Sequence, residues 1–535
     1  MLSTSDTQIE SYVAVQAAQT KHDADYVFYE LTRSICPECR RVIDAQILLR
    51  DNKVYMRKRC PEHDMFEALV YGDAQAYTTN TKFNKPGTIP LQYTTPVEQG
   101  CPHDCGLCPD HQQHACLGII EVNSACNMDC PLCFADAGPG FNLTLDEVEH
   151  ILDHFVATEG SPEVVQFSGG EPSIHPEIVP MMRAAQARNI RHVMLNTNGK
   201  RIANDDAFLA ALAEIQPVIY FQFDGFEAET YRITRGEPDI LQEKLRALDR
   251  LASIGGRVIL VPAIERGVNE HEVGRILKFG IAHPAVRGIN FQPAFHTGRH
   301  GTHDPMQRMT IPDMLKLIQA QTDNLFLESD FVPVPCCFPT CNSVTYAFME
   351  GDPSSSSGQA TVTPLTRLLN VDDYLDYISN RVMPDFDRAV KAALEGLWSS
   401  SVVPGSEKAA REFALTCAAC GLPDGGLDPS LHSGQVLGEL SQRMFGVMLQ
   451  DFMDPWTFNQ KNLMKCCKEI LLPDGKQIPF CAYNNVGYRE QARSQLAARQ
   501  RARANAERAG IAYSPEPLTF SFAQPFAHRN GKGKI

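Results

Sequence analysis

The sequence predicts an α/β fold in which a parallel sheet closes partway into a TIM-like (βα)6 barrel. Over residues 117–330, six apolar runs of strand length alternate with five stretches of helical periodicity. Such alternation implies right-handed βαβ crossovers, which place the strands parallel in one sheet. The expected strands are 117–122, 164–167, 192–195, 218–223, 257–261 and 288–291. The expected helices are 145–157, 176–188, 204–214, 238–254 and 270–282.

Length and composition describe an ordinary soluble protein. The chain has 535 residues, of which 43% are hydrophobic and 21% charged, enough for several domains with buried cores. Its net charge of −15 argues against a nucleic-acid partner, because no overall positive field would attract phosphate. We expect a cytoplasmic protein, since the first residues show no signal-peptide pattern. No apolar run approaches the roughly 18 residues of a membrane helix, so any contact with the inner face of a membrane would be peripheral.

Eighteen cysteines occur in short-spaced groups. Close pairs of this kind suit metal binding better than a disulfide framework, which is mainly a device of small secreted domains. We expect five segments. They are an N-terminal helix with a metal module (1–72), a connector with a cysteine-rich cluster segment (73–116), the barrel (117–330), an auxiliary iron-sulfur domain (331–487) and a polar helix with a disordered tail (488–535).

The first metal module surrounds a predicted β-hairpin over 42–58. Cys36 and Cys39 precede the hairpin and Cys60 follows it, so its two ends bring soft ligands to one place. This arrangement resembles a rubredoxin or zinc-ribbon site and would hold one iron or zinc ion. His63 is a candidate for the fourth ligand, and a cysteine from elsewhere in the chain is the alternative.

The sequence repeats one cysteine spacing twice. Cys101, Cys105 and Cys108 are spaced x3 and x2, and seven residues separate Cys108 from Cys116. Four cysteines within sixteen residues could ligate a complete cluster that carries electrons or holds an intermediate. This first copy could instead be the site with an open iron. We reject that interpretation because no buried-strand pattern precedes Cys108.

The second copy directly follows the first expected strand and consists of Cys126, Cys130 and Cys133. Three thiolates on one tight loop can hold three irons of a 4Fe-4S cluster and leave the fourth open. S-adenosylmethionine (SAM) can chelate an open iron, and an electron from the cluster can then cleave its sulfonium to give a carbon radical. The alternatives are a zinc knuckle that lacks one ligand and three unrelated cysteines.

Further candidate residues lie where the expected strands end. Two glycines stand in the Ser-Gly-Gly-Glu-Pro segment 168–172 after the second strand, where they allow a backbone to approach a ligand closely. Polar residues follow the third and fourth strands, and an apolar residue ends the fifth. In parallel sheets, ligand sites lie beyond these carboxyl ends. The alternatives are a tight turn for the glycines, ordinary loop residues for the polar ones and plain core for the apolar one.

A cysteine loop after the first strand and Gly-Gly-Glu-Pro after the second together resemble the radical SAM superfamily. The resemblance implies that the glycine segment meets the amino group of SAM, and that ribose, carboxylate, adenine or substrate contacts follow the later strands. It also implies an electron donor such as flavodoxin or ferredoxin. No catalytic side chain is predicted. The expected cofactor contacts are Gly169, Gly170, Glu171, Pro172, Asn198, Asp224 and Val261.

Cysteines return after residue 330. A hairpin turn at 473–475 would bring the pair Cys466/Cys467 near Cys481. Together with the group 336–341, this resembles the auxiliary cluster domain of many radical SAM enzymes, so we expect one or two auxiliary 4Fe-4S clusters. The favoured ligands are Cys336, Cys341, Cys466 and Cys481, with Cys337 and Cys467 as alternatives.

Other C-terminal segments carry weaker signals. Cys417 and Cys420 could supply a missing pair or form a small knuckle. The Ser/Gly-rich stretch 353–360 reads as a surface segment, and 530–535 as a disordered tail. The stretch 488–509 is rich in Arg, Ala and Gln and predicts a solvated helix, with contact to anionic lipid headgroups as the alternative.

Over residues 30–490, the combined motifs resemble the archaeal tetraether lipid synthase group, whose members are also described as methylases of a dihydro-hydroxymethylpterin. For the lipid synthase, the resemblance implies radical formation of a C–C bond between unactivated carbons of lipid chains. The same-class alternative is C-methylation of a pterin or similar ring. The alternative from another class is a zinc-stabilised binding protein without enzymatic activity.

Overall fold

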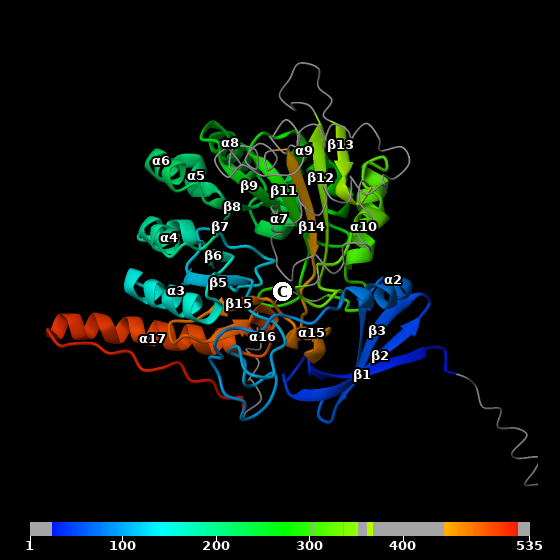
Figure 1. Cartoon of the computed structure of the whole chain (residues 1–535), viewed down its shortest axis with the longest axis horizontal. Helices are drawn as coiled ribbons and strands as arrows, with labels where there is room; N and C mark the ends of the chain where they lie inside the picture. The colour runs from blue at the N-terminus through cyan, green and yellow to red at the C-terminus, as the bar shows by residue number, and fades with distance from the viewer. Residues whose placement is uncertain (1–23, 301–302, 335, 351–360, 368–442, 523–535) are drawn as a thin grey trace, which may run out of the picture.

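The computed structural model describes residues 24–300, 303–334, 336–350, 361–367 and 443–522 (Figure 1). A twelve-stranded mixed sheet forms the main body, and a four-stranded antiparallel sheet forms the N-terminal module. The segments expected at 353–360 and 530–535, the N-terminal helix within 1–23, and Cys417 and Cys420 lie outside the described residues.

The six expected barrel strands are confirmed, and they pair in parallel in chain order. Their polar residues and glycines therefore gather at one edge of the sheet. The fold class is a partial TIM-like barrel, as predicted. The strands are β5 (Leu117–Asn123), β6 (Val164–Gly169), β7 (His192–Thr197), β8 (Val218–Gln222), β9 (Arg257–Val261) and β11 (Val286–Pro293).

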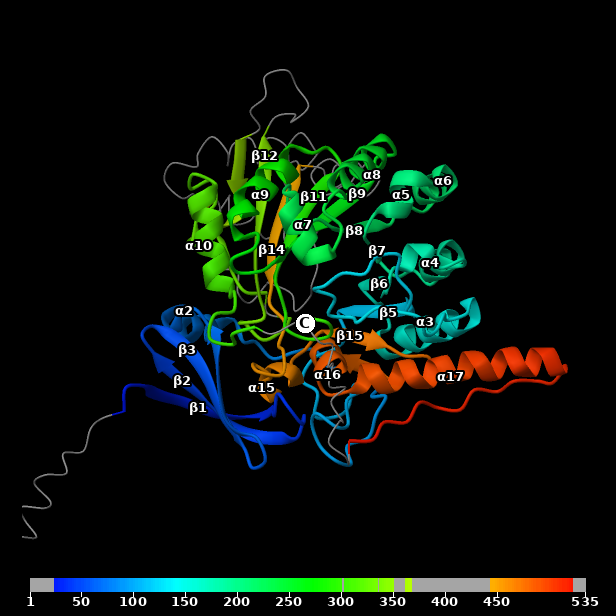
Figure 2. The ribbon, with the colours of Figure 1, turned by 180° about the vertical axis from the view of Figure 1, so that it is seen from behind.

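Helices cover the outer face of these strands (Figures 1 and 2). The first, α3 (Leu145–Glu159), begins with a capping box between Thr144 and Glu147, and it buries Val148, Ile151, Leu152 and Phe155 at helical spacing. Four more match the expected stretches: α4 (Ile178–Ala187), α6 (Asp206–Ile215), α8 (Leu241–Ser253) and α9 (Val273–Ala282). Three were not predicted: α5 (Lys200–Asn204), α7 (Ala228–Arg235) and α10 (Ile311–Gln321).

Strands from beyond residue 330 extend the sheet at both edges. At one edge, β14 (Met444–Gln450) pairs in parallel with β11, and β12 (Asn342–Glu350) and β13 (Thr361–Pro364) continue antiparallel. At the other edge, β15 (Lys468–Leu471) pairs in parallel with β5 and antiparallel with β16 (Gln477–Pro479). The short β10 (Ala263–Ile264) pairs with β11. The C-terminal segment therefore shares the barrel sheet.

The N-terminal module is a meander of β1 (Val27–Ile35), β2 (Val42–Arg50), β3 (Lys53–Cys60) and β4 (Asp64–Tyr71). The expected hairpin is confirmed as β2 and β3, which turn at Asp51 and Asn52, both with positive φ. Buried Lys58 donates a 2.7 Å hydrogen bond to the carbonyl oxygen of Pro455 and so fastens the module to the body. The helix α2 (Ala74–Thr79) and the 3-10 helix at Asn80–Phe83 follow it.

The chain returns to the body in α15 (Gln460–Met464) and α16 (Phe480–Asn485) and ends in α17 (Tyr488–Ala509), which projects outward (Figures 1 and 2). The helix expected at 488–509 is confirmed, but Tyr488 and Arg489 of its first turn are buried, and Arg489 pairs with Glu121 at 2.8 Å. None of the described helices combines the length and the apolar character needed to cross a membrane. Further 3-10 turns lie at Pro172–Ile174, Glu270–Glu272, Glu328–Asp330 and Leu365–Arg367.

Candidate functional site

The loop that carries Cys126, Cys130 and Cys133 lies against the glycine segment that ends β6. The backbone N–H of Gly170 donates to the carbonyl oxygen of Asn123 at 3.0 Å, and that of Glu171 donates to Ala125 at 2.9 Å. A Cβ on Gly169 would lie 2.2 Å from the Asn123 oxygen, and one on Gly170 would lie 2.1 Å from the Ala125 oxygen. Both glycines are therefore required for the approach of two backbones, directly before the first cysteine.

The carboxylate of Glu171 connects this segment to the end of β7. It is buried and accepts hydrogen bonds from the Ser173 N–H (3.0 Å), the Thr197 hydroxyl (2.7 Å) and the Asn198 N–H (2.7 Å). Burial raises the pKa of Glu171, although these donors act in the opposite direction. Because three protein donors satisfy its carboxylate, the side chain of Glu171 positions the neighbouring loops. The backbone of Glu171 still lies at the predicted cofactor edge of the sheet.

Asn198 reaches the cysteine loop from β7. Its side-chain amide donates to the Asn127 side-chain oxygen at 2.7 Å, and its own oxygen accepts from the Lys200 N–H at 3.0 Å. The buried ammonium of Lys244 donates to the Asn198 carbonyl at 3.2 Å and to the Gln222 carbonyl at 2.8 Å. The ends of β7 and β8 are thus joined beside the cysteine loop.

Asp224, after β8, is fully buried and forms a two-point ion pair with Arg235, at 2.5 and 2.8 Å. Its carboxylate also accepts from the Ala263 N–H at 3.0 Å. Burial raises the pKa of the Cys130 thiol, while the neighbouring Arg235 lowers it. Arg235 therefore places a fixed positive charge beside the cysteine loop, and Asp224 holds that charge in position.

A third segment clamps the same loop. Arg299 donates its backbone N–H to the Cys133 carbonyl at 2.9 Å, and its guanidinium contacts Asp136 at 2.9 Å. A Cβ on Gly298 would lie 2.5 Å from the Cys133 oxygen, so the backbones also touch here. Pro172 is buried after the glycine segment, and Val261 is mostly buried at the end of β9.

The donor set of this loop fits an iron-sulfur cluster. All three thiols are partly exposed at the sheet edge, and burial raises the pKa of Cys126 to about 12. A buried neutral thiol gains most from a cation that stabilises its thiolate, as cluster iron does. The exposed peptide groups of the glycine segment lie beside the loop, where the amino group of a chelated SAM would need them.

The concave face of the sheet is polar. The Tyr220 hydroxyl of β8 accepts hydrogen bonds from the side-chain amides of Asn290 (2.5 Å) and Gln292 (2.7 Å) of β11, across β9. On the same face, Asn196 donates to the Ser168 hydroxyl at 3.2 Å. Side chains alternate along a strand, and Phe221, next to Tyr220, faces the helix layer. The interior above the sheet is therefore lined with hydrogen-bonding groups.

The N-terminal module brings its four expected ligands together. The ligand atoms of Cys36, Cys39, Cys60 and His63 all lie within 4.8 Å of one another. Burial raises the pKa of Cys36 to about 11, whereas backbone N–H groups and His63 outweigh burial at Cys60 and lower its pKa to about 7. Three thiols and one imidazole make a tetrahedral set suited to zinc or iron.

The C-terminal cysteines group differently from the expected sets. The thiols of Cys116, Cys336 and Cys467 lie within 4.8 Å of one another, and Cys337 packs against them. Cys116 is therefore placed with the C-terminal group rather than with Cys101, Cys105 and Cys108. The pairing of β15 with β5 explains this, because the Leu117 N–H donates to the Cys467 carbonyl at 3.0 Å.

Cys101, Cys105 and Cys108 line a recess closed by residues of α15 and by Pro479. The Cys105 N–H donates to the Tyr488 hydroxyl at 3.1 Å, so α17 holds this loop. Of the other expected ligands, Cys341 packs beside the group formed by Cys116, Cys336 and Cys467. The Cys466 thiol donates a hydrogen bond to the Lys468 carbonyl oxygen at 3.4 Å, and Cys481 is buried in α16. None of them forms a disulfide with another cysteine of the described residues.

Several residues at this edge were not predicted from the sequence. Arg235, Lys244 and Arg299 lie on helices or loops where basic residues are ordinarily solvated, so no sequence signal separates them from surface charges. Gly298 could have been found, since it stands seven residues after the sixth expected strand. Asn127 lies inside the cysteine motif itself.

Comparison with known families finds two matches. The model of the Radical SAM superfamily matches residues 120–280, and that of the HMPTM N-terminal zinc ribbon domain matches residues 28–72. The second range contains all four ligands of the N-terminal site.

Individual relatives were also found. The chain is 32% identical over 495 residues to 7,8-dihydro-6-hydroxymethylpterin dimethyltransferase of Methanocaldococcus jannaschii, which covers 86% of this chain and 94% of that protein. It is 30% identical over 179 residues to GTP 3′,8-cyclase of Chlorobaculum tepidum, covering 32% of this chain and 53% of the cyclase. Among solved structures, Streptococcus suis SuiB aligns with a TM-score of 0.34 and 15% identity over 40% of this chain and 47% of SuiB.

Proposed function

The chain belongs to the radical SAM superfamily, and on this premise we propose that it methylates a carbon of a dihydropterin or a similar polar fused ring. The observation that carries the proposal is the 32% identity over 495 residues to a protein named as a hydroxymethylpterin dimethyltransferase. The comparisons thus favour the pterin alternative over lipid coupling, and lipid biosynthesis has no support among them. A non-enzymatic zinc-binding protein is excluded by the superfamily.

The polar concave face supports a polar substrate. Tyr220, Asn290 and Gln292 present a hydroxyl and two amides, groups that match the alternating donors and acceptors of a pterin ring. The Asn290 side-chain oxygen is buried and has no hydrogen-bond partner among the described residues. An alkyl chain would leave such a group unsatisfied, at about 1–3 kcal/mol, whereas a ring N–H would satisfy it.

The superfamily implies SAM and one 4Fe-4S cluster, which when bound supply a carbon radical able to abstract hydrogen from an unactivated carbon. Cys126, Cys130 and Cys133 would hold the cluster. The glycine segment orients the methionyl end of SAM through its peptide groups. Arg235 stabilises the negative charge of the thiolates from one side, because a buried cation acts strongly at low dielectric.

The finer predictions form part of the proposal. The cysteine groups of the C-terminal half and of residues 101–108 would hold one or two auxiliary 4Fe-4S clusters, and the N-terminal site a mononuclear zinc or iron. A flavodoxin or ferredoxin would deliver electrons in the cytoplasm. The five expected segments remain our proposed division of the chain, with the auxiliary segment 331–487 sharing the barrel sheet.

The test is an anaerobic reaction with dithionite, SAM, a hydroxymethyl-dihydropterin and the small-molecule fraction of an anaerobic extract as a source of one-carbon donors. We expect 5′-deoxyadenosine and a pterin heavier by one or two CH2 groups. A parallel reaction contains ether lipids in place of the pterin. Coupled lipid with an unchanged pterin would contradict the proposal and restore the lipid prediction.

Tyr220→Phe tests the polar face separately. Without the Tyr220 hydroxyl, the side-chain amides of Asn290 and Gln292 lose their shared acceptor and must rearrange. We therefore expect the KM for the pterin to rise about tenfold, corresponding to roughly 1.4 kcal/mol. Cleavage of SAM without substrate should persist. The matched control is Tyr93→Phe, since Tyr93 is exposed. An unchanged KM in Tyr220→Phe would remove this face from the substrate site.

A further inference from the structure

A group of three histidines forms a second kind of candidate metal site, without cysteine. We call His296, His300 and His303 the histidine cluster; their ligand atoms all lie within 4.8 Å of one another. The rings of His296 and His303 are stacked with centroids 3.7 Å apart, and the ring of His300 stands edge-on to His296 at 4.3 Å. The three histidines, spaced x3 and x2 in the sequence after β11, thus have their rings side by side.

Glu265, directly after β10, places a carboxylate oxygen beside two of these rings. Its Oε2 lies 3.0 Å from His300 Nε2 and 3.6 Å from His296 Nε2. The carboxylate side chain is 19% exposed, so it is neither a surface charge nor a core residue. Glu265 therefore lies beside two of the three imidazoles, with no cysteine among them.

The imidazole ring of His296 is buried without hydrogen bonds to either nitrogen among the described residues. Its side chain is 2% exposed, and His303 Nε2 likewise has no hydrogen-bond partner among the described residues. An orphaned buried nitrogen costs about 1–3 kcal/mol. A metal ion accepts the lone pair of a neutral imidazole, so an ion between these rings would remove the cost.

The other nitrogen of His296 faces a fixed carboxylate. Its Nδ1 lies 3.5 Å from Asp454 Oδ2, which also has no hydrogen-bond partner among the described residues. Asp454 Oδ1 accepts from the Trp456 N–H (2.9 Å), the Thr457 N–H (3.0 Å) and the Thr457 hydroxyl (3.1 Å). Metal-bound histidines commonly present their second nitrogen to such a carboxylate.

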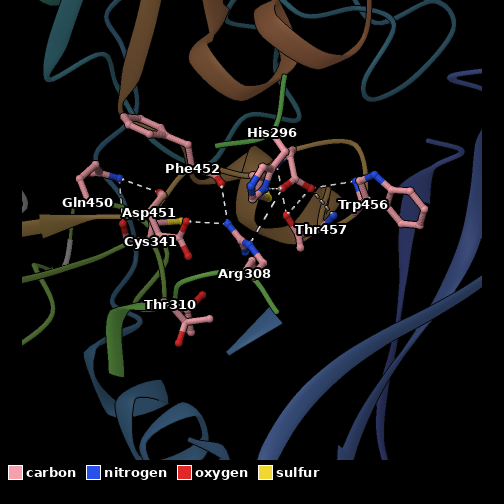
Figure 3. Close-up of polar contacts among 12 residues, drawn as sticks. His296, Arg308, Thr310, Cys341, Gln450, Asp451, Phe452, Trp456 and Thr457 are labelled. Atoms are coloured by element: carbon pink, nitrogen blue, oxygen red, sulfur yellow. Dashed lines mark hydrogen bonds and ion pairs between the residues drawn. The ribbon is translucent and has the colours of Figure 1, made fainter. Parts of the chain in front are cut away.

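Arg308 is the competing partner of Asp454. In Figure 3 the guanidinium of Arg308 points to Asp451. It donates a hydrogen bond to Asp451 at 2.9 Å and approaches Asp454 no closer than 4.0 Å. Arg308 therefore forms its ion pair mainly with Asp451. Asp454 remains directed at His296 rather than paired with an arginine.

We propose that the histidine cluster and Glu265 bind one divalent transition-metal ion, with Asp454 orienting His296. Nitrogen and carboxylate donors of this kind suit Zn2+ or Fe2+ and differ from the thiolate sites elsewhere in the chain. With four protein ligands the ion is structural. It ties the end of β10 to the segment 296–300, whose Gly298 and Arg299 clamp the Cys126–Cys133 loop. The proposal is independent of the substrate.

The test measures bound zinc in full-length protein purified anaerobically after growth with added Zn2+. Zinc, iron and sulfide per chain are compared between wild type, Glu265→Gln and His303→Gln after gel filtration. We expect both variants to lose one zinc per chain while iron and sulfide stay constant. The matched control is His150→Gln, which removes an exposed histidine of α3 that stands edge-on to His154.

Zinc X-ray absorption identifies the ligands of the lost ion. The difference between wild type and variant should contain N/O scatterers at about 2.0–2.1 Å and no sulfur at about 2.3 Å. Equal zinc in wild type and Glu265→Gln, or lost scatterers that are sulfur, would overturn the proposal. If His303→Gln also loses iron through misfolding, the near-isosteric Glu265→Gln decides. Wild-type protein without any N/O-bound zinc would overturn it directly.

Discussion

Gly170→Ala tests the central packing contact of the candidate site. The added Cβ would lie 2.1 Å from the Ala125 oxygen and 2.6 Å from the Ser124 oxygen, whereas real Cβ atoms keep at least 3.0 Å. Both obstacles are backbone, so the cysteine loop must move by about 0.9 Å. The shift disrupts the two hydrogen bonds that join the segments, each worth about 1 kcal/mol. A displacement of about 1 Å at reacting groups can cost about 100-fold in rate.

The assay is formation of 5′-deoxyadenosine from SAM in dithionite-reduced protein with iron content matched to wild type. We expect Gly170→Ala to fall by about 100-fold. Gly138→Ala is the control, because Gly138 follows the same cysteine loop and an added Cβ meets no atom within 4 Å. Wild-type activity in Gly170→Ala would refute the argument that the glycines exist to bring these backbones together.

Three further predictions follow from buried charges and ligands. Arg235→Met leaves Asp224 unpaired in the interior and should lower the free energy of unfolding by about 3–5 kcal/mol in urea titrations, whereas Arg232→Met on the same helix, with an exposed partner, should change it little. Burial and two nearby arginines lower the pKa of His192 to about 4 in the folded protein. The imidazole of the unfolded chain takes up a proton below about 6.5, so the free energy of unfolding should fall as the pH drops from 6.5 to 4, by at most about 1.4 kcal/mol per pH unit. His192→Asn should flatten that slope. Cys60→Ser should release the N-terminal metal while cluster iron is retained; simultaneous loss of cluster iron, measured by metal analysis, would contradict separate sites.

The barrel and its ligand edge could be predicted from the sequence because they depend on local patterns. Each of the six strands is an apolar run followed by its own loop, and the cysteine and glycine motifs lie within a few residues of a strand end. The parallel order then follows from the handedness of βαβ units. The ligands of the N-terminal site were predictable for the same reason, since a hairpin brings the two cysteine groups together.

Long-range pairing could not be predicted in this way. β14 and β15 join the sheet beside strands more than 150 residues earlier, and no helix pattern marks them as barrel units. The placement of Cys116 with Cys336 and Cys467 depends on that pairing. The ion pair between Arg235 and Asp224 likewise joins residues whose types occur on any protein surface.

The most direct test of the account is the mass of the pterin after anaerobic turnover with SAM and reductant. The account predicts a gain of one or two CH2 groups that accompanies 5′-deoxyadenosine formation and disappears in Cys130→Ala. A pterin of unchanged mass, under conditions where SAM is cleaved and ether lipids are coupled, would contradict it.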